Sequence, residues 1–238
     1  MKFENKVVVI TGAGSGIGRA CAAEFAKVQL IKTSGGVAVS VEADVSAPAS
    51  VQNLVKETIA NFSVVHALVN NAAIQVNKTI EDTSFEEWNQ QPSINLGGVF
   101  LCSKYFLPHL RQTKGSIVNM SSVNGFFVEP TCAGYCATKA GIIGLTKAMA
   151  IDHGHEGVRV NCICPCYIDA GLAEGYFQSQ PDPAKARVEA GKLHALWRIG
   201  KPEEVGRVAV FLASEDASFV TGSSFVVDGG FGSGLPPK

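Results

Sequence analysis

The sequence predicts a single α/β domain in which a parallel β-sheet is covered by helices on both faces. Three observations lead to this prediction. The chain has 238 residues, 46% of them hydrophobic, and is therefore long enough to bury one substantial core. Short apolar, β-branched runs alternate with longer segments of helical periodicity. No repeat, linker or low-complexity stretch divides residues 1–238, and apolar strands alternating with helices are typical of a parallel sheet buried on both sides.

The elements follow one another regularly along the chain. Ser84 followed by Glu87 forms a capping box that opens a short helix, and Pro202 occupies the first turn of another. The expected strands are Val7–Ile10, Val37–Val41, Ala67–Val69, Ser116–Met120, Val158–Cys164 and Phe225–Val227. The longer expected helices are Ile17–Lys27, Ala49–Asn61, Ser93–Arg111, Ala133–Asp152 and Pro202–Ala213.

Charge and hydropathy argue against several kinds of partner. A net charge of -1 and a pI near 6.5 leave no basic field for nucleic acid. Apolar runs such as Val7–Ile10 fall far short of the roughly 18 residues that span a bilayer. The N-terminus carries no recognisable secretory signal. We therefore expect neither a nucleic-acid nor a membrane partner.

The seven cysteines are irregularly spaced, except that Cys162, Cys164 and Cys166 alternate and so share one face of a strand. They are either small buried thiols in a reducing compartment or part of a metal site. No second cluster completes such a site. We expect no metal and a cytosolic protein.

A glycine-rich turn joins the first strand to the first helix, with the sequence Thr11-Gly12-Ala13-Gly14-Ser15-Gly16-Ile17-Gly18. Glycines permit a tight turn and the close approach of a pyrophosphate. The helix N-terminus behind them offers free N–H groups and the positive end of the helix dipole. The turn is either a phosphate-binding loop or a purely structural strand-to-helix connection.

One predicted helix carries Tyr135 and Lys139 four residues apart, which places both side chains on the same helical face. A free tyrosine titrates near 10, and a neighbouring ammonium is expected to lower the pKa of this phenol. Such a phenol can donate a proton to a developing alkoxide or accept one from an alcohol. The alternative is an amphipathic helix with a polar edge.

Further polar residues stand where two predicted strands end. Ser121 and Ser122 follow one strand, and Asn70 and Asn71 end another. In a doubly wound sheet, ligands bind outside the carboxyl ends of the strands. Asn95 lies in the helix between these strands. Taken singly, each residue is equally well explained as a loop cap or a hydrogen-bonded core residue.

Together, these features resemble the short-chain dehydrogenase/reductase family over essentially the whole chain. The matching features are the Thr-Gly-x-x-x-Gly-x-Gly turn, Asn70-Asn71-Ala72, Ser122 thirteen residues before Tyr135, Tyr135-x-x-x-Lys139, Asn161, Pro165 and Val227-Asp228-Gly229-Gly230. The resemblance implies a Rossmann-like fold and an NAD(P)-dependent oxidoreductase that transfers a hydride between nicotinamide and a ketone or secondary alcohol. The three-residue gap between the tyrosine and the lysine implies carbonyl rather than enoyl chemistry.

The resemblance also implies catalytic roles. Tyr135 is then the general acid/base, and Lys139 lowers its pKa and holds the nicotinamide ribose. Ser122 hydrogen-bonds the substrate oxygen where charge develops. Asn95 holds a water that links Lys139 to bulk solvent.

The implied cofactor site extends from the glycine-rich turn across the sheet. Asp44 and Val45 contact adenine, and Asn71 and Ala72 lie near the adenosine-side ribose. The candidate cofactor-binding residues are Gly12, Ser15, Gly16, Ile17, Gly18, Asp44, Val45, Asn71, Ala72, Tyr135, Lys139, Pro165 and Ile168. NAD is favoured over NADP, which stays possible, because Ser15 stands where relatives that prefer NADP often carry a basic residue.

The largest departure from the family pattern follows the first helix. No Asp or Glu occurs between Glu24 and Glu42, although dinucleotide folds place an acidic residue about 20 residues beyond the glycines to hold the ribose. A strand and most of a helix are therefore missing near Lys27/Val28. Either the numbering omits a loop, so that this Cα–Cα distance exceeds about 3.8 Å, or the chain is truly shortened. In the second case Val37–Val41 is expected to take the missing place beside the first strand.

Smaller departures also bear on the cofactor. Ala73 and Cys166 stand where the family has glycines, and Ala170 replaces a threonine that often holds the carboxamide. A Cβ at positive φ costs of order 1 kcal/mol, so we expect these changes to weaken cofactor binding. They motivate a second hypothesis, a catalytically silent relative that acts as a binding or scaffold protein.

Residues 169–198 correspond to the family's variable substrate loop. Its apolar residues either line the pocket for an uncharged, partly apolar ketone or alcohol, or pack the loop and a subunit interface; they are Leu172, Tyr176, Phe177, Leu193, Leu196 and Trp197, with Phe126 and Phe127 from elsewhere. The resemblance further implies a homo-oligomer, a tetramer or dimer, built through the long helices.

Overall fold

A five-stranded, entirely parallel sheet with the order β1-β2-β3-β4-β5 forms the centre of the molecule. This computed structural model describes residues 3–29 and 37–234. The strands are β1 (Val8–Ile10), β2 (Ala67–Asn70), β3 (Ser116–Met120), β4 (Arg159–Pro165) and β5 (Ser224–Val227). The predicted α/β class with a parallel sheet is confirmed, and these five strands lie within about one residue of their expected bounds.

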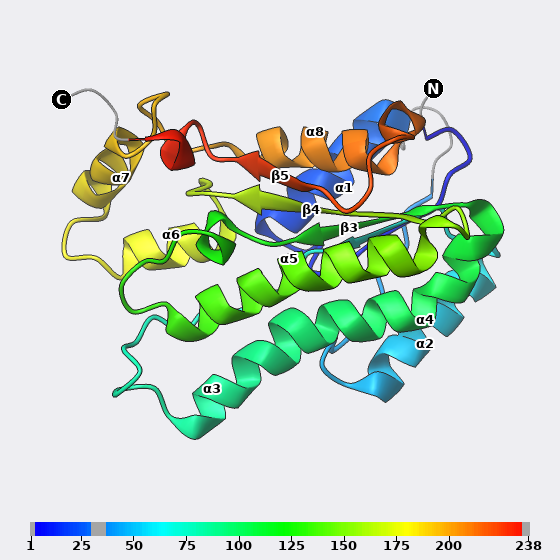
Figure 1. The fold of residues 1–238 in the computed structure, drawn as a ribbon, viewed down its shortest axis with the longest axis horizontal. Helices are drawn as coiled ribbons and strands as arrows, with labels where there is room; N and C mark the ends of the chain where they lie inside the picture. The colour runs from blue at the N-terminus through cyan, green and yellow to red at the C-terminus, as the bar shows by residue number, and fades with distance from the viewer. Residues whose placement is uncertain (1–2, 30–36, 235–238) are drawn as a thin grey trace.

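Helices cover both faces of the sheet (Figure 1). Helices α1 and α8 pack on each other over one face, and α2, α4 and α5 cover the other. The helices are α1 (Gly16–Gln29), α2 (Pro48–Phe62), α3 (Phe85–Pro92), α4 (Gly98–Thr113), α5 (Ala133–Gly154), α6 (Gly171–Gln178), α7 (Pro183–Lys192) and α8 (Pro202–Ala213).

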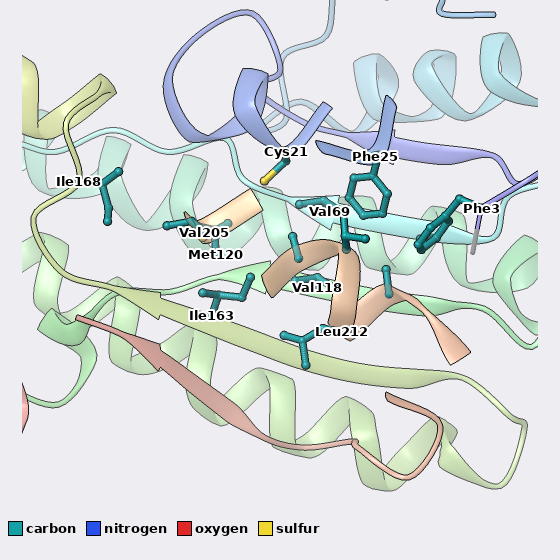
Figure 2. Packing of buried hydrophobic residues seen from close by; sticks show 14 residues of the cluster. Phe3, Cys21, Phe25, Val69, Val118, Met120, Ile163, Ile168, Val205 and Leu212 are labelled. Atoms are coloured by element: carbon teal, nitrogen blue, oxygen red, sulfur yellow. The ribbon is translucent and has the colours of Figure 1, made fainter. Parts of the chain in front are cut away.

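The strands are apolar on both sides because each face supports its own core. Figure 2 shows the first core, where Cys21 and Phe25 of α1 meet Val69 and Val118 of the sheet and Leu212 of α8. The intervening strand residues, among them Leu68 and Ile117, point to the other face and pack against α2 and α4. Each fully buried side chain of this size contributes roughly 1.5–3 kcal/mol, so the two cores hold the carboxyl ends of the strands in fixed positions.

Local sequence signals account for several helix ends. The capping box is present at α3, where the Ser84 hydroxyl accepts from the backbone N–H of Glu87 and the Glu87 carboxylate accepts from that of Ser84. Prolines occupy the first turns of α2, α7 and α8, where their missing N–H costs nothing. The expected helix at 93–111 begins differently, since Ser93–Gly97 forms a π-helical turn that joins α3 to α4.

The expected strand at 37–41 is wrong. Residues 37–44 have no regular secondary structure, and in the described ranges β1 pairs only with β2. Val37 and Val39 are exposed, whereas Val41 packs against the core beside α2. Residues 37–40 are all exposed, so the alternating sequence is not matched by alternating burial. The segment does not take the missing place beside β1.

Helix α1 runs through Lys27 and Val28 without interruption. With β1 at the edge of the described sheet, the strand expected to be missing after the first helix has no counterpart in the described residues. Both explanations, omitted residues and a truly shortened chain, stay predictions.

Candidate active site

A cavity of about 700 Å³ opens where the carboxyl ends of β1, β2, β3 and β4 meet the substrate loop. It brings together most of the residues that the sequence singled out. The predicted residues that line it are Gly12, Ser15, Gly16, Ile17, Asn71, Ala72, Ser122, Tyr135, Lys139, Pro165 and Ile168. Gly18, Asp44, Val45 and Asn95 lie outside this lining.

The glycine-rich turn is held against the end of β2. Gly12 has a φ of +65°, and a Cβ there would lie 3.0 Å from the Asn71 side chain and 3.1 Å from the Ala72 Cα. The Thr11 hydroxyl accepts from the backbone N–H groups of Asn71 (3.0 Å) and Ala72 (3.1 Å). The Asn71 amide donates to the Thr11 carbonyl at 3.1 Å. Thr11, which was not among the predicted site residues, therefore fixes the geometry of the turn.

The N-terminus of α1 faces the cavity through Ser15, Gly16 and Ile17. Free N–H groups and the positive helix dipole at this position suit a pyrophosphate. Gly18 has another reason to be glycine, because a Cβ there would lie 2.2 Å from the Gly12 carbonyl oxygen. A Cβ on Gly16 would similarly meet the backbone of Gly171 at 3.3 Å. The glycines thus form a close-packed cradle that fits a dinucleotide's phosphates, with the loop before α6 lying against it.

Ser122, Tyr135 and Lys139 converge at the end of β3. The Ser122 hydroxyl donates to the Pro165 carbonyl at 3.4 Å and accepts from the Asn124 backbone N–H at 3.1 Å. It lies near enough to the phenol of Tyr135 to lower the pKa of that group. The Lys139 ammonium lies 5.3 Å from the centre of the Tyr135 ring and donates to the Met120 carbonyl at 2.7 Å. All three side chains are buried, so the predicted helical pair and the serine share one enclosed corner of the cavity.

The expected fall in the pKa of Tyr135 is wrong for the protein chain itself. Burial raises the pKa of this phenol well above its usual range, and the Ser122 hydroxyl offsets only part of that rise. Burial also lowers the pKa of Lys139 to about 8. The protonated phenol is therefore the stable form near neutral pH, and it is the form that can donate a proton.

Asn95 lies in the π-helical turn and is fully buried. Its Oδ1 accepts from the backbone N–H of Ile74 at 2.8 Å, and its Nδ2 donates to the carbonyl of Ile74 at 2.9 Å and to the Thr138 hydroxyl at 3.2 Å. π-Turns often occur at functional sites. Here the turn directs an amide that joins the loop after β2 to α5, the helix that carries Tyr135.

The expected adenine contacts lie away from the cavity. The Asp44 carboxylate accepts from both the backbone N–H and the hydroxyl of Ser46, at 2.9 and 2.7 Å. Val45 is buried, and a Cβ added to Gly98 of α4 would touch it. Asp44 therefore closes a local turn and Val45 packs the core, and neither residue lines the cavity.

The substitutions expected to strain the cofactor site do not do so. Ala73 and Cys166 line the cavity at ordinary negative φ, and Ala170 is extended with a φ of -172°. The predicted cost of a Cβ at positive φ is therefore wrong for all three. All three line the cavity without positive-φ strain.

The substrate loop contains two helices, α6 and α7, that the sequence did not predict. Arg187 of α7 forms ion pairs with Asp169 and with Glu174 of α6, and its guanidinium lies 4.9 Å from the centre of the Phe177 ring. Leu172 and Tyr176 line the cavity as expected. The other apolar residues named for this wall lie outside its lining; Phe177 is buried within the loop, whereas Leu193, Leu196, Trp197, Phe126 and Phe127 are exposed.

The cavity also contains polar residues that were not predicted from the sequence. Glu129, Tyr167 and Gln75 all line it. Within residues 3–29 and 37–234, no cluster of histidine, cysteine and carboxylate side chains has a metal-binding arrangement. Over the same ranges no helix is long and apolar enough to cross a membrane.

A parallel α/β sheet with a phosphate cradle, and a buried Ser–Tyr–Lys group at its carboxyl edge, defines a dinucleotide-dependent oxidoreductase. Comparison with known proteins agrees. A family model described as enoyl-(acyl carrier protein) reductase matches residues 23–232. Meso-2,3-butanediol dehydrogenase from Serratia marcescens is 40% identical, over 97% of this chain and 96% of that protein. Cyclohexanol dehydrogenase from an Acinetobacter species is 38% identical, over 97% and 96%.

Solved structures give the same result. The aldohexose dehydrogenase of Thermoplasma acidophilum superposes with a TM-score of 0.92 at 35% identity, covering 99% of this chain and 97% of that one. Levodione reductase has a TM-score of 0.92 at 32% identity, covering 98% and 100%. The chain belongs to the short-chain dehydrogenase/reductase family, and it is an oxidoreductase acting on CH–OH groups with NAD(P).

The relatives also bear on the shortened segment. The alignments with the butanediol and cyclohexanol dehydrogenases extend over 246 and 251 positions, more than the 238 residues of this chain. Both relatives therefore contain residues with no counterpart here. This agrees with a sheet in which β1 is at the edge of the described strands.

Proposed function

We propose that this enzyme interconverts an uncharged ketone and its secondary alcohol, with Tyr135 as the general acid/base. The observation that carries the proposal is the buried Tyr135 phenol, which shares one cavity with Ser122, Lys139 and the glycine cradle. Because burial keeps the phenol protonated, it is ready to donate to a substrate oxygen.

The roles of the residues follow from these positions. A nicotinamide dinucleotide bound along the cradle supplies or takes up the hydride. Ser122 holds the substrate oxygen beside Tyr135 through its hydroxyl. In reduction, the Tyr135 Oη proton passes to the oxygen as negative charge develops there, and in oxidation the phenolate removes it. Lys139 brings a positive charge next to the ring and favours that phenolate.

Asn95 has a positioning role in this proposal. Its amide fixes both backbone groups of Ile74 and reaches Thr138 on α5. It thereby sets the loop after β2 against the helix that carries Tyr135 and Lys139. We propose that it also orders the water through which Lys139 exchanges protons with solvent.

We propose NAD as the cofactor. Ser15 occupies the position on the glycine-rich turn where a basic residue favours NADP. The site residues proposed for the cofactor are those predicted from the sequence; Asp44 and Val45 are the least well placed of them.

The substrate is proposed to be small and uncharged. Leu172, Tyr176 and Ile168 give the cavity an apolar side. The related proteins named above act, by their names, on butanediol and cyclohexanol, which are neutral secondary alcohols. The four-residue step from Tyr135 to Lys139 supports carbonyl rather than enoyl chemistry, although the matching family model is named for an enoyl reductase.

We propose further that the protein is a cytosolic homo-oligomer, a tetramer or dimer. All seven cysteines are free thiols, which suits a reducing compartment. The helices α4 and α5 cover the same face of the sheet (Figure 1) and expose large apolar side chains, Phe100 and Ile151. Such exposed apolar residues are typical of protein interfaces. Size-exclusion chromatography with light scattering measures the oligomeric state.

The experiment that tests the activity is reduction of a panel of neutral ketones, followed by the loss of NADH absorbance. Saturable turnover of at least one ketone supports the proposal. Failure to reduce any of them, together with no saturable binding of NADH or NADPH at millimolar concentration, identifies a silent relative instead.

A further inference from the structure

Glu129 places a carboxylate in the wall of the active-site cavity. Both of its oxygens are held. The hydroxyl of Tyr167 donates to Oε1 at 2.6 Å, and the Nδ2 of Asn124 donates to Oε2 at 2.9 Å. Each carboxylate oxygen can accept more than one hydrogen bond, so the fixed side chain still has free acceptor sites.

This carboxylate is connected to the catalytic residues. Asn124 donates through its side chain to Glu129 and through its backbone N–H to the Ser122 hydroxyl, at 3.1 Å. One residue thus links the carboxylate to the serine that is proposed to hold the reacting oxygen. After burial, which is the main cause, the charge of Glu129 is among the influences that raise the pKa of Tyr135. Glu129 and Tyr135 therefore lie within electrostatic reach of each other.

The charged side chains that line the cavity also limit which substrates can bind. Of its lining residues, only Glu129 and Lys139 carry charged side chains. The Lys139 ammonium is bonded to the Met120 carbonyl at 2.7 Å, on the floor of the site at the end of β3. The substrate side of the cavity, where Tyr167 and Tyr176 stand, therefore has a negative charge without a facing cation in the described lining.

We propose that Glu129 is a specificity-determining residue that accepts a hydrogen bond from a second hydroxyl of the substrate, next to the reacting carbon. The substrate class is then the α-hydroxy ketones and the corresponding vicinal diols. A carboxylate or phosphate in that position is repelled by Glu129. This inference rests on the proposed function, since it assigns the substrate class of the same site.

The test compares two ketones that differ by one hydroxyl, 3-hydroxy-2-butanone and 2-butanone. The ratio of their kcat/KM values is measured for the wild type, Glu129→Gln and Glu129→Leu. A hydrogen bond to a charged group is worth roughly a ten- to hundredfold change in binding. We expect the wild type to favour the hydroxy ketone, and the ratio to fall by about that factor in Glu129→Leu and by less in Glu129→Gln, which keeps an acceptor oxygen.

The charge is tested separately with 2-oxobutanoate, a ketone that bears a carboxylate. Its kcat/KM relative to 2-butanone should rise in Glu129→Gln, because the repelling charge is gone. Glu86→Gln is the matched control, since Glu86 is an exposed carboxylate at the start of α3 and should alter neither ratio. Melting curves of every variant show whether the fold is retained.

If the ratios of kcat/KM in Glu129→Leu equal those of the wild type, the proposed role of Glu129 is overturned. Turnover of ketones by the wild type would still support the proposed function. If the wild type reduces no ketone, the proposed function fails. The hydroxyl-binding role is then decided by saturation-transfer NMR of 2,3-butanediol. Binding to the wild type that is lost in Glu129→Leu supports the role, and equal signals from the two proteins contradict it.

Discussion

The ammonium of Lys139 is bonded to the carbonyl of Met120, 2.7 Å away, at the end of β3. This contact holds a buried cation beside the Tyr135 ring, 5.3 Å from its centre, without pairing it to a carboxylate. The arrangement keeps Lys139 available to a ligand, and it explains why burial governs the pKa values of both residues.

Lys139 should make the stability of the protein depend on alkaline pH. Burial lowers its pKa from the ordinary 10.5 to about 8 in the native state. Between these values the unfolded chain binds more protons than the native chain, so unfolding free energy rises with pH. We expect the wild type to gain stability relative to Lys139→Met over this window, by at most about 1.4 kcal/mol per pH unit. Urea denaturation from pH 7 to 11 measures the difference; a constant difference would show that Lys139 has an ordinary pKa.

Gly12 should be far more sensitive to substitution than Gly14 in the same turn. Gly12 has a φ of +65° and packs on Asn71 and Ala72, whereas a Cβ on Gly14 would meet nothing within 4 Å. We expect Gly12→Ala to cost at least about 1–2 kcal/mol and to weaken NADH binding. Gly14→Ala, as the matched control, should stay within about 0.5 kcal/mol of the wild type. Equal melting temperatures for the two variants would contradict this account of the turn.

Asn95→Ala should destabilise the loop after β2. The substitution leaves the backbone N–H and C=O of Ile74 without the partners they have now, at an expected cost of about 1–3 kcal/mol. Asn61→Ala is the control, because that exposed asparagine makes a single bond to the Glu57 carbonyl. Denaturant unfolding of both variants measures the two costs, and a loss in Asn95→Ala no larger than in Asn61→Ala argues against the bridging role.

Most of the fold could be predicted from the sequence because strand and helix periodicities are strong wherever both faces are buried. The segment at 37–41 shows where periodicity alone fails to predict a strand. Its alternation of valines is typical of a strand, but a strand also requires a partner, and in the described residues β1 pairs with β2 alone. Helices α6 and α7 were missed since both are short and are joined to each other by ion pairs such as Arg187–Glu174 rather than by a regular apolar stripe.

The catalytic part of the site could be predicted because its residues occur at fixed spacings, as with Tyr135 and Lys139. Glu129 could not, since a single acidic residue in a loop gives no signal until Tyr167 and Asn124 are brought against it. The pKa of Tyr135 was wrongly predicted for a related reason. The sequence shows the neighbouring lysine, but the extent of burial, which outweighs it, depends on the packed structure.

The central claim is that Tyr135 moves the proton, and Tyr135→Phe tests it most directly. The variant keeps the ring and its packing but removes the hydroxyl, which shares the cavity with Ser122. We expect kcat for ketone reduction to fall by about 10²–10⁴-fold, with NADH binding, measured by fluorescence titration, retained. A Tyr135→Phe enzyme whose kcat stays within a few-fold of the wild-type value would contradict the account.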